Sequence, residues 1–311
     1  MPSSNADFYL WSGSSPESLR KLKNSIRGMK RWPLQLHYTR QVLDWASEEE
    51  SDVRFYLAGS DEQRAKTLRI LLEDPKVENI FCTRGGYGAI RVLEVLDKWK
   101  IHPKGKKVVW GYSDSTIIQM YLFQRFGWTW VHAPMLCSQS WQEPDSRENK
   151  AFKDLFKKDG FSYQKNLKIW NLGNKSIPKK VQILGGNLMS IVSMFGRDWL
   201  KKPKQPYFLF LEDITEGYYK IDRLISILGQ SKFFENCQGI LLGHFTDCPG
   251  YRDILKTWAK ERGLFLASRI DAGHESPNIP LYMGDKIEIR KISSKEVKVI
   301  FPSIKLEAGE D

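Results

Sequence analysis

The stretch that decides the fold of this chain is Val108-Val109-Trp110-Gly111-Tyr112-Ser113-Asp114-Ser115. An apolar run ends there at a glycine, and an amphipathic pattern follows, with apolar side chains at Ile117, Met120, Tyr121 and Phe126. A strand that turns into a helix within about two residues crowds its own backbone, so the side chain at the corner projects outward. The stretch therefore predicts a strand, a sharp turn at Ser113, and a helix that starts at Ser113 or Asp114.

Two interpretations of this corner are open from the residues alone. Ser113 is a candidate nucleophile, because the free amides at the start of a helix favour an oxygen anion that forms beside them. Alternatively, Ser113 or Asp114 is an ordinary helix N-cap, a position that both residue types favour. The hydrolase pattern G-x-S-x-G fails at its last position, where Ser115 stands.

Length and composition narrow the class of protein. The chain has 311 residues, 41% of them hydrophobic, which is enough for two compact domains or one large one. Its sequence contains no run of about 18 apolar residues, and its first residues lack the basic start and apolar core of a secretory signal. We expect a cytoplasmic protein that does not enter a membrane.

The sequence offers no support for a cofactor or a nucleic-acid partner. Its 4 cysteines and 5 histidines are scattered, without C-x-x-C or H-E-x-x-H spacing, so neither a metal site nor a disulfide framework is expected. The dinucleotide pattern G-x-G-x-x-G is absent. The net charge of +11 raises nucleic acid as a partner, but the basic runs lack aromatic interleaving and are typical of a solvated surface.

The first half alternates apolar strands with helical segments, which is typical of a parallel sheet covered on both faces. Ser60 and Gln63 form a capping box for a helix that runs to about Asp74. The expected strands are residues 8–11, 34–38, 79–83, 108–110 and 129–132.

A glycine-rich turn, Arg84-Gly85-Gly86-Tyr87-Gly88, follows the third of these strands. Three glycines let a backbone approach a ligand closely and leave amides unobstructed at the start of the next helix, residues 89–96. A turn that only packs this helix against its strand is the alternative.

Residues 151–180 are polar and irregular, with a short helix expected at 152–158, and they are predicted to link the two domains. The second half then shows strands at 181–187, 207–211 and 239–243 and a closing hairpin of 287–289 with 297–299. Glu212 and Asp213 end one of these strands, where ligands of open parallel sheets bind, and neighbouring residues of a strand point to opposite faces. Either acid could therefore face a site. His274 lies in a loop rich in glycine and proline.

Nucleophile, acid and histidine thus occur in that order along the chain, and their flanking residues resemble one family, the LD-carboxypeptidases of the serine peptidase class, which includes the microcin-immunity peptidases. The matching segments are Leu57-Ala58-Gly59-Ser60-Asp61, Arg84-Gly85-Gly86-Tyr87-Gly88, Gly111-Tyr112-Ser113-Asp114, His132-Ala133-Pro134-Met135, Gly185-Gly186-Asn187-Leu188, Leu211-Glu212-Asp213-Ile214, Ile221-Asp222-Arg223 and Gly273-His274.

The resemblance implies a role for each residue. Ser113 is the nucleophile, His274 its general base and later acid, and Glu212 the carboxylate that orients the imidazole, with Asp213 as the rival acid. The backbone amides of Gly86 and Asp114 are the expected oxyanion donors. Further candidates for substrate contacts are Arg84, Gly85, Asn187 and Glu216, the last of these for an ammonium group of the substrate.

The resemblance also implies an architecture and an activity. The fold is expected to be α/β, with a flavodoxin-like (class I glutamine amidotransferase-like) parallel-sheet domain in residues 1–150, a linker in 151–180 and a swivelling β/β/α-type domain in 181–311. The expected reaction is release of the terminal D-alanine from murein tetrapeptides during peptidoglycan recycling, by a homodimer. The alternative is cleavage of a peptidyl nucleotide antibiotic.

Overall fold

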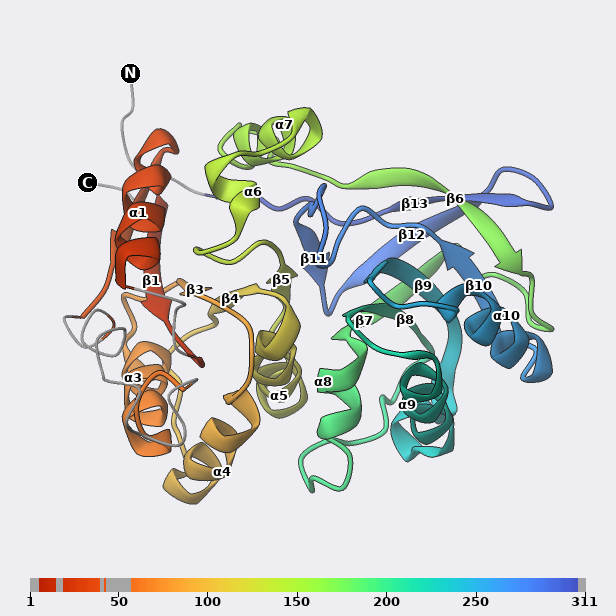
Figure 1. Ribbon diagram of the computed structural model, residues 1–311, viewed down its shortest axis with the longest axis horizontal. Coiled ribbons are helices and arrows are strands. Elements are labelled where there is room, and N and C mark those ends of the chain that lie inside the picture. The colour runs from red at the N-terminus through yellow and green to blue at the C-terminus, as the bar shows by residue number, and fades with distance from the viewer. Residues whose placement is uncertain (1–5, 15–18, 40–41, 43–56, 307–311) are drawn as a thin grey trace.

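The computed structural model describes residues 6–14, 19–39, 42 and 57–306. Its first layer is a 6-stranded sheet in the order β11-β5-β4-β3-β1-β2 (Figure 1). The strands β1 to β5 pair in parallel, as the alternation of strands and helices predicts, and β11 runs antiparallel to β5. These strands are β1 (Ala6–Trp11), β2 (Leu34–His37), β3 (Asn79–Cys82), β4 (Val108–Gly111), β5 (Trp130–His132) and β11 (Leu281–Met283).

Helices cover both faces of this sheet. Successive residues of a strand point to opposite faces, so Phe81 and Trp110 pack with one set of helices while Cys82 and Val109 pack with the other. Burial on both sides explains why β3 and β4 are largely apolar. The helices are α1 (Leu19–Gly28), α6 (Gln139–Gln142) and α7 (Ser146–Leu155) on one face, and α3 (Asp61–Glu73), α4 (Ala89–Trp99) and α5 (Thr116–Phe126) on the other.

The capping box predicted at Ser60 is confirmed. The backbone N–H of Gln63 donates to Ser60 Oγ at 3.2 Å, and the backbone N–H of Ser60 donates to Gln63 Oε1 at 2.8 Å. Both atoms satisfy amides that the first turn of α3 would otherwise leave unpaired.

The second layer is a closed barrel in the strand order β10-β6-β13-β12-β7-β8-β9. The predicted hairpin of β12 with β13 is confirmed, and β7, β8 and β9 pair in parallel. The barrel strands are β6 (Gln164–Asn171), β7 (Lys180–Asn187), β8 (Tyr207–Ile214), β9 (Cys237–Thr246), β10 (Phe265–Ser268), β12 (Lys286–Lys291) and β13 (Glu296–Ile300), and its helices are α8 (Leu188–Ser193), α9 (Tyr218–Gln230) and α10 (Tyr251–Glu261).

The segment expected to be an irregular linker contains a barrel strand. Strand β6 pairs with β13 along residues 164–168 and with β10 near its end. Its outer face is polar and Leu167 is its one fully buried residue, so no apolar run marks it in the sequence. The helix expected at 152–158 is instead α7, which starts earlier because Asp145 and Glu148 form a capping box.

One strand pairing within the first sheet links distant parts of the chain. Figure 1 shows β11, near the end of the sequence, beside β5, and Leu281 is the register partner of His132. The C-terminal half thus returns to extend the first sheet, and the carboxyl end of β4 comes to lie close to the barrel. Among the helices that the structure describes, none has the length and apolar character needed to cross a bilayer.

Candidate active site

Ser113 occupies a strained corner between β4 and a short 3₁₀ helix, Ser113–Ser115, that precedes α5. Its φ of 60° lies in the left-handed region, which residues with side chains seldom adopt. The predicted turn is thus confirmed, although its first turn is 3₁₀ and the α-helix proper begins at Thr116. A strained corner between a strand and a helix exposes the hydroxyl of a serine that occupies it.

The alternative that Ser113 or Asp114 caps its own helix is wrong, because no side-chain cap bond exists at the start of the 3₁₀ helix or of α5. The Asp114 carboxylate instead accepts a hydrogen bond of 2.9 Å from the backbone N–H of Ala89, the first residue of α4. Burial raises the pKa of Asp114 to about 7. Asp114 therefore ties the serine turn to the helix that follows the glycine-rich turn.

A buried arginine holds the glycine-rich turn in place through hydrogen bonds. Arg64 of α3 is fully buried, and its guanidinium donates to the carbonyl oxygens of Gly13 and Gly88, each at 2.8 Å. It thereby joins the loop after β1 to the loop after β3. Neither the charge of Arg64 nor its position on a helix predicts this role from the sequence.

The turn needs glycine where it passes the serine. A Cβ built on Gly85 would lie 2.9 Å from Ser113 Oγ, closer than real Cβ atoms come, and Gly86 has a φ of 104°. Backbone therefore runs directly over the serine hydroxyl, which a packing turn alone would not require.

His274 and Glu212 form a hydrogen-bonded pair on the barrel side. The imidazole Nδ1 and Glu212 Oε2 are 2.7 Å apart, and the Glu212 side chain is 0% exposed. Burial would raise the pKa of Glu212, but the His274 charge and hydrogen bond hold it below its usual value. Burial likewise opposes the charged form of His274, yet the Glu212 carboxylate raises its pKa above the usual value. Because Gly273 has a φ of 132°, the loop can place His274 over the carboxylate.

Asp213 points away from this pair. Its carboxylate accepts from the Asn187 side-chain amide at 2.8 Å and from the backbone N–H of Met189 at 3.0 Å. Burial and then the nearby Glu212 charge raise the pKa of Asp213 to about 7. Of the two adjacent acids, Glu212 is therefore the one that meets the imidazole, and Asp213 supports the start of α8.

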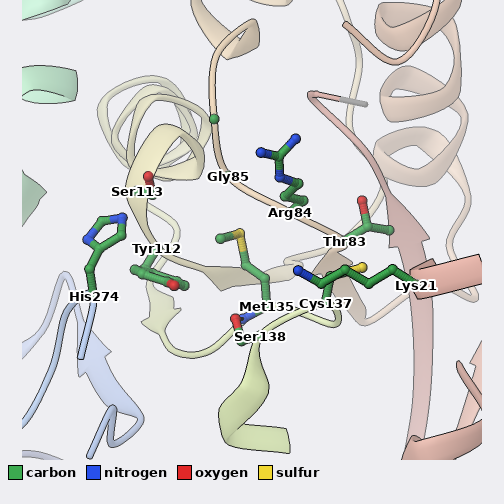
Figure 2. A pocket seen from close by; sticks show the side chains of 11 residues that line it. Lys21, Thr83, Arg84, Gly85, Tyr112, Ser113, Met135, Cys137, Ser138 and His274 are labelled. Atoms are coloured by element: carbon green, nitrogen blue, oxygen red, sulfur yellow. Dashed lines mark hydrogen bonds between the residues drawn. The ribbon is translucent and has the colours of Figure 1, made fainter. Parts of the chain in front are cut away.

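Ser113 and His274 line one cavity of about 250 Å³. Figure 2 shows both side chains at the same end of this cavity, with Tyr112 beside them and Arg84 and Lys21 farther along. The His274 and Tyr112 rings are packed with centroids 4.7 Å apart. The remaining lining residues are Thr83, Gly85, Gly86, Met135, Cys137 and Ser138.

The other predicted contact residues lie elsewhere. Asn187 caps α8, and its backbone N–H donates to Thr116 Oγ1 at 3.2 Å across the two layers. Glu216 approaches Lys220 at 3.6 Å. Neither residue lines the cavity with Ser113, whereas Arg84, Gly85 and Gly86 do.

Sequence reasoning missed Lys21 and Tyr112 as cavity residues. Tyr112 could have been found as the neighbour of Ser113, but nothing in the spacing of the basic helix singles out Lys21. His132 is fully buried with its ring 5.0 Å from that of Phe210, and burial lowers its pKa to about 4. Within the described parts of the chain, no group of three or more His, Cys, Asp or Glu side chains is arranged to hold a metal ion.

Family profiles of known proteins match both halves of the chain. The sequence profile of the LD-carboxypeptidase N-terminal domain matches residues 9–133, and that of the LD-carboxypeptidase C-terminal domain matches residues 180–289. These two segments carry Ser113 on one side and Glu212 and His274 on the other. The chain belongs to the LD-carboxypeptidase family. It is a carboxypeptidase of the serine class.

Individual relatives are similar over most of the length of this chain. A probable murein peptide carboxypeptidase of Bacillus subtilis is 30% identical over 284 residues, which are 88% of this chain and 85% of the relative. The microcin C7 self-immunity protein MccF of Escherichia coli is 25% identical over 267 residues, 76% of this chain and 77% of that protein. The muramoyltetrapeptide carboxypeptidase from Oxalobacter formigenes has a similar fold, with a TM-score of 0.77 at 20% identity over 96% of this chain and 99% of the other.

Proposed function

We propose that this protein removes the terminal D-alanine from murein tetrapeptides, with Ser113 as nucleophile, His274 as general base and acid, and Glu212 as the orienting carboxylate. The observation that carries the proposal is the strained Ser113 corner, which shares a cavity with an imidazole held by a buried carboxylate. Family membership and the Bacillus subtilis relative, whose name refers to murein peptides, support this substrate class.

The proposed reaction has two halves. Ser113 Oγ attacks the carbonyl carbon of the amide that joins D-alanine to an L-configured centre, while His274 Nε2 takes the hydroxyl proton. The backbone amides of Gly86 and Asp114 stabilise the oxyanion. The C–N bond then breaks, His274 returns the proton to the leaving amine of D-alanine, and water hydrolyses the acyl-enzyme by the same route.

The raised pKa of His274 predicts the pH dependence of this reaction. His274 must be neutral to accept a proton, so kcat/KM should fall as the pH decreases through its folded-state pKa, which the Glu212 carboxylate raises above the usual value for histidine. Initial rates of alanine release from pH 5 to 9 should show this inflection. The inflection should shift to lower pH in Glu212→Gln, if activity is measurable, because that change removes the charge that raises the pKa. A flat profile would contradict the role of His274.

A second candidate function is favoured by the match to MccF, a self-immunity protein against microcin C7. Incubation with a murein tetrapeptide and, separately, with a peptidyl nucleotide antibiotic distinguishes the two. We expect alanine release from the tetrapeptide. Cleavage of the nucleotide conjugate alone would assign this chain to the immunity function.

Glu216 remains our sequence-based candidate for the ammonium group of a diamino acid in the substrate. If it has that role, Glu216→Gln should raise KM for a lysine-containing tetrapeptide several-fold while kcat changes little. Asp222→Asn, an exposed acid on α9, the helix that follows Glu216, is the matched control. An unchanged KM would remove Glu216 from the site, consistent with its position outside the cavity.

We further infer a flavodoxin-like N-terminal domain, because β2-β1-β3-β4-β5 reproduces the 2-1-3-4-5 strand order of that fold. The division into residues 1–150 and 181–311, joined by a segment 151–180 that contributes β6 to the barrel, remains a proposal that rests on the family resemblance. A swivelling motion of the C-terminal domain, a homodimer and a cytoplasmic location are proposals on the same basis. Size-exclusion chromatography with light scattering tests the dimer.

A further inference from the structure

The cleft around His274 has ends of opposite charge. On one side, the cavity that holds Ser113 is lined by the basic side chains of Lys21 and Arg84. On the other side, an adjoining cavity of about 350 Å³ shares Tyr112, Ser138 and His274 with the first. The charged residues of the adjoining cavity, apart from the shared histidine, are the acids Glu143, Glu148 and Glu275.

Lys21 reaches the cavity from a helix that contributes no other residue to its lining. Figure 2 shows its side chain extending from α1 toward Met135, on the opposite side of the cavity from His274. It is half-buried, whereas its neighbours Arg20 and Lys23 are exposed and do not line the cavity. Its aliphatic stem therefore lies against protein while its charged end faces the space beyond Ser113.

We propose that Lys21, together with Arg84, binds the terminal carboxylate of the substrate and so restricts cleavage to the last residue of a peptide. This inference rests on the proposed function and adds the group that recognises a free carboxyl end. Charge-assisted hydrogen bonds from lysine and arginine are the usual means of holding a carboxylate. Of the acids in the adjoining cavity, Glu275 is paired with Arg269, whereas Glu143 and Glu148 disfavour a second carboxylate there, so the basic end is its better position.

The size of the basic cavity agrees with this role. A space of about 250 Å³ is small for a binding pocket and suits one short residue beyond the bond that Ser113 attacks. A longer C-terminal extension would have to pass Lys21 and would carry the carboxylate out of its reach. Lys21 is thus a specificity residue, and the chemical step does not involve it.

The test compares two tetrapeptides that differ only at the C-terminus, one a free acid and the other a carboxamide. In Lys21→Met, the ratio of kcat/KM for the acid to that for the amide should fall about tenfold, because one charged contact to the carboxylate is lost. Lys21→Arg should restore most of the ratio. Lys23→Met, on the exposed side of the same helix, should keep the wild-type ratio. A wild-type ratio in Lys21→Met would overturn the proposal.

A binding experiment separates this inference from the proposed function. In a Ser113→Ala background, calorimetry with the same two peptides measures the preference for the free acid without turnover. Loss of that preference on adding Lys21→Met supports the carboxylate site even if the wild-type protein releases no alanine, an outcome that would refute the proposed function alone. Equal affinity for the acid and the amide in the Ser113→Ala protein would overturn the carboxylate site.

Discussion

Replacing Ser113 by alanine should reduce kcat/KM for alanine release about a millionfold, because the attacking oxygen is removed and the histidine then has no proton to accept. Among the residues that the structure describes, none receives a hydrogen bond from the Ser113 hydroxyl, so the fold should be little affected. Initial rates and the thermal unfolding temperature of Ser113→Ala, measured together, test both statements.

The matched control is Ser115→Ala, two residues away. The Ser115 hydroxyl donates to the Tyr112 carbonyl oxygen at 2.8 Å and does not line the cavity. Ser115→Ala should therefore keep most of the activity. A fluorophosphonate should label the wild type and Ser115→Ala but not Ser113→Ala. Retained hydrolysis in Ser113→Ala would contradict the assignment of the nucleophile.

Glu212→Gln should lower kcat about ten-thousandfold with little change in KM. The amide has nearly the shape of the carboxylate, but it carries no charge to stabilise the imidazolium. It can also turn an N–H toward Nδ1 and so favour the wrong tautomer. Steady-state kinetics on the tetrapeptide, with circular dichroism to check the fold, measure this effect.

Asp213→Asn is the control for Glu212→Gln, because it makes the same chemical change one residue along the strand. Asp213 holds the Asn187 side chain and the first turn of α8, so its replacement should lower the unfolding temperature more than it lowers kcat. The reverse result, with kcat lost in Asp213→Asn and kept in Glu212→Gln, would exchange the roles of the two acids.

Much of this site could be predicted from the sequence, because some local geometries require a recognisable pattern of residues. The apolar run, glycine and serine of residues 108–115 predict a sharp corner, and that corner is present. The choice between Glu212 and Asp213 could not be made from the sequence, since it depends on which face of β8 meets the loop of His274. The sequence also allows Asp114 to be interpreted as a cap of its own helix. Its hydrogen-bond partner, Ala89, belongs to a different helix, α4, and this contact cannot be predicted from local sequence.

Other features depend on contacts between segments far apart in the chain. Strand β6 is largely polar and has only one fully buried residue, so only its barrel partners reveal it as a strand. Strand β11 is too short to be recognised by pattern, yet it joins the barrel half to the first sheet through β5. Lys21 becomes a cavity residue only once α1 has packed beside α6. Tertiary packing of this kind leaves no local periodicity to read.

The most direct measurement for the whole account is chromatographic identification of the amino acid released from a purified murein tetrapeptide, with a peptide that ends in two D-residues incubated in parallel. We expect D-alanine from the tetrapeptide, where the bond follows an L-configured centre, and no release from the D,D-terminated peptide. Release from neither peptide, or equal release from both, would contradict the central claim.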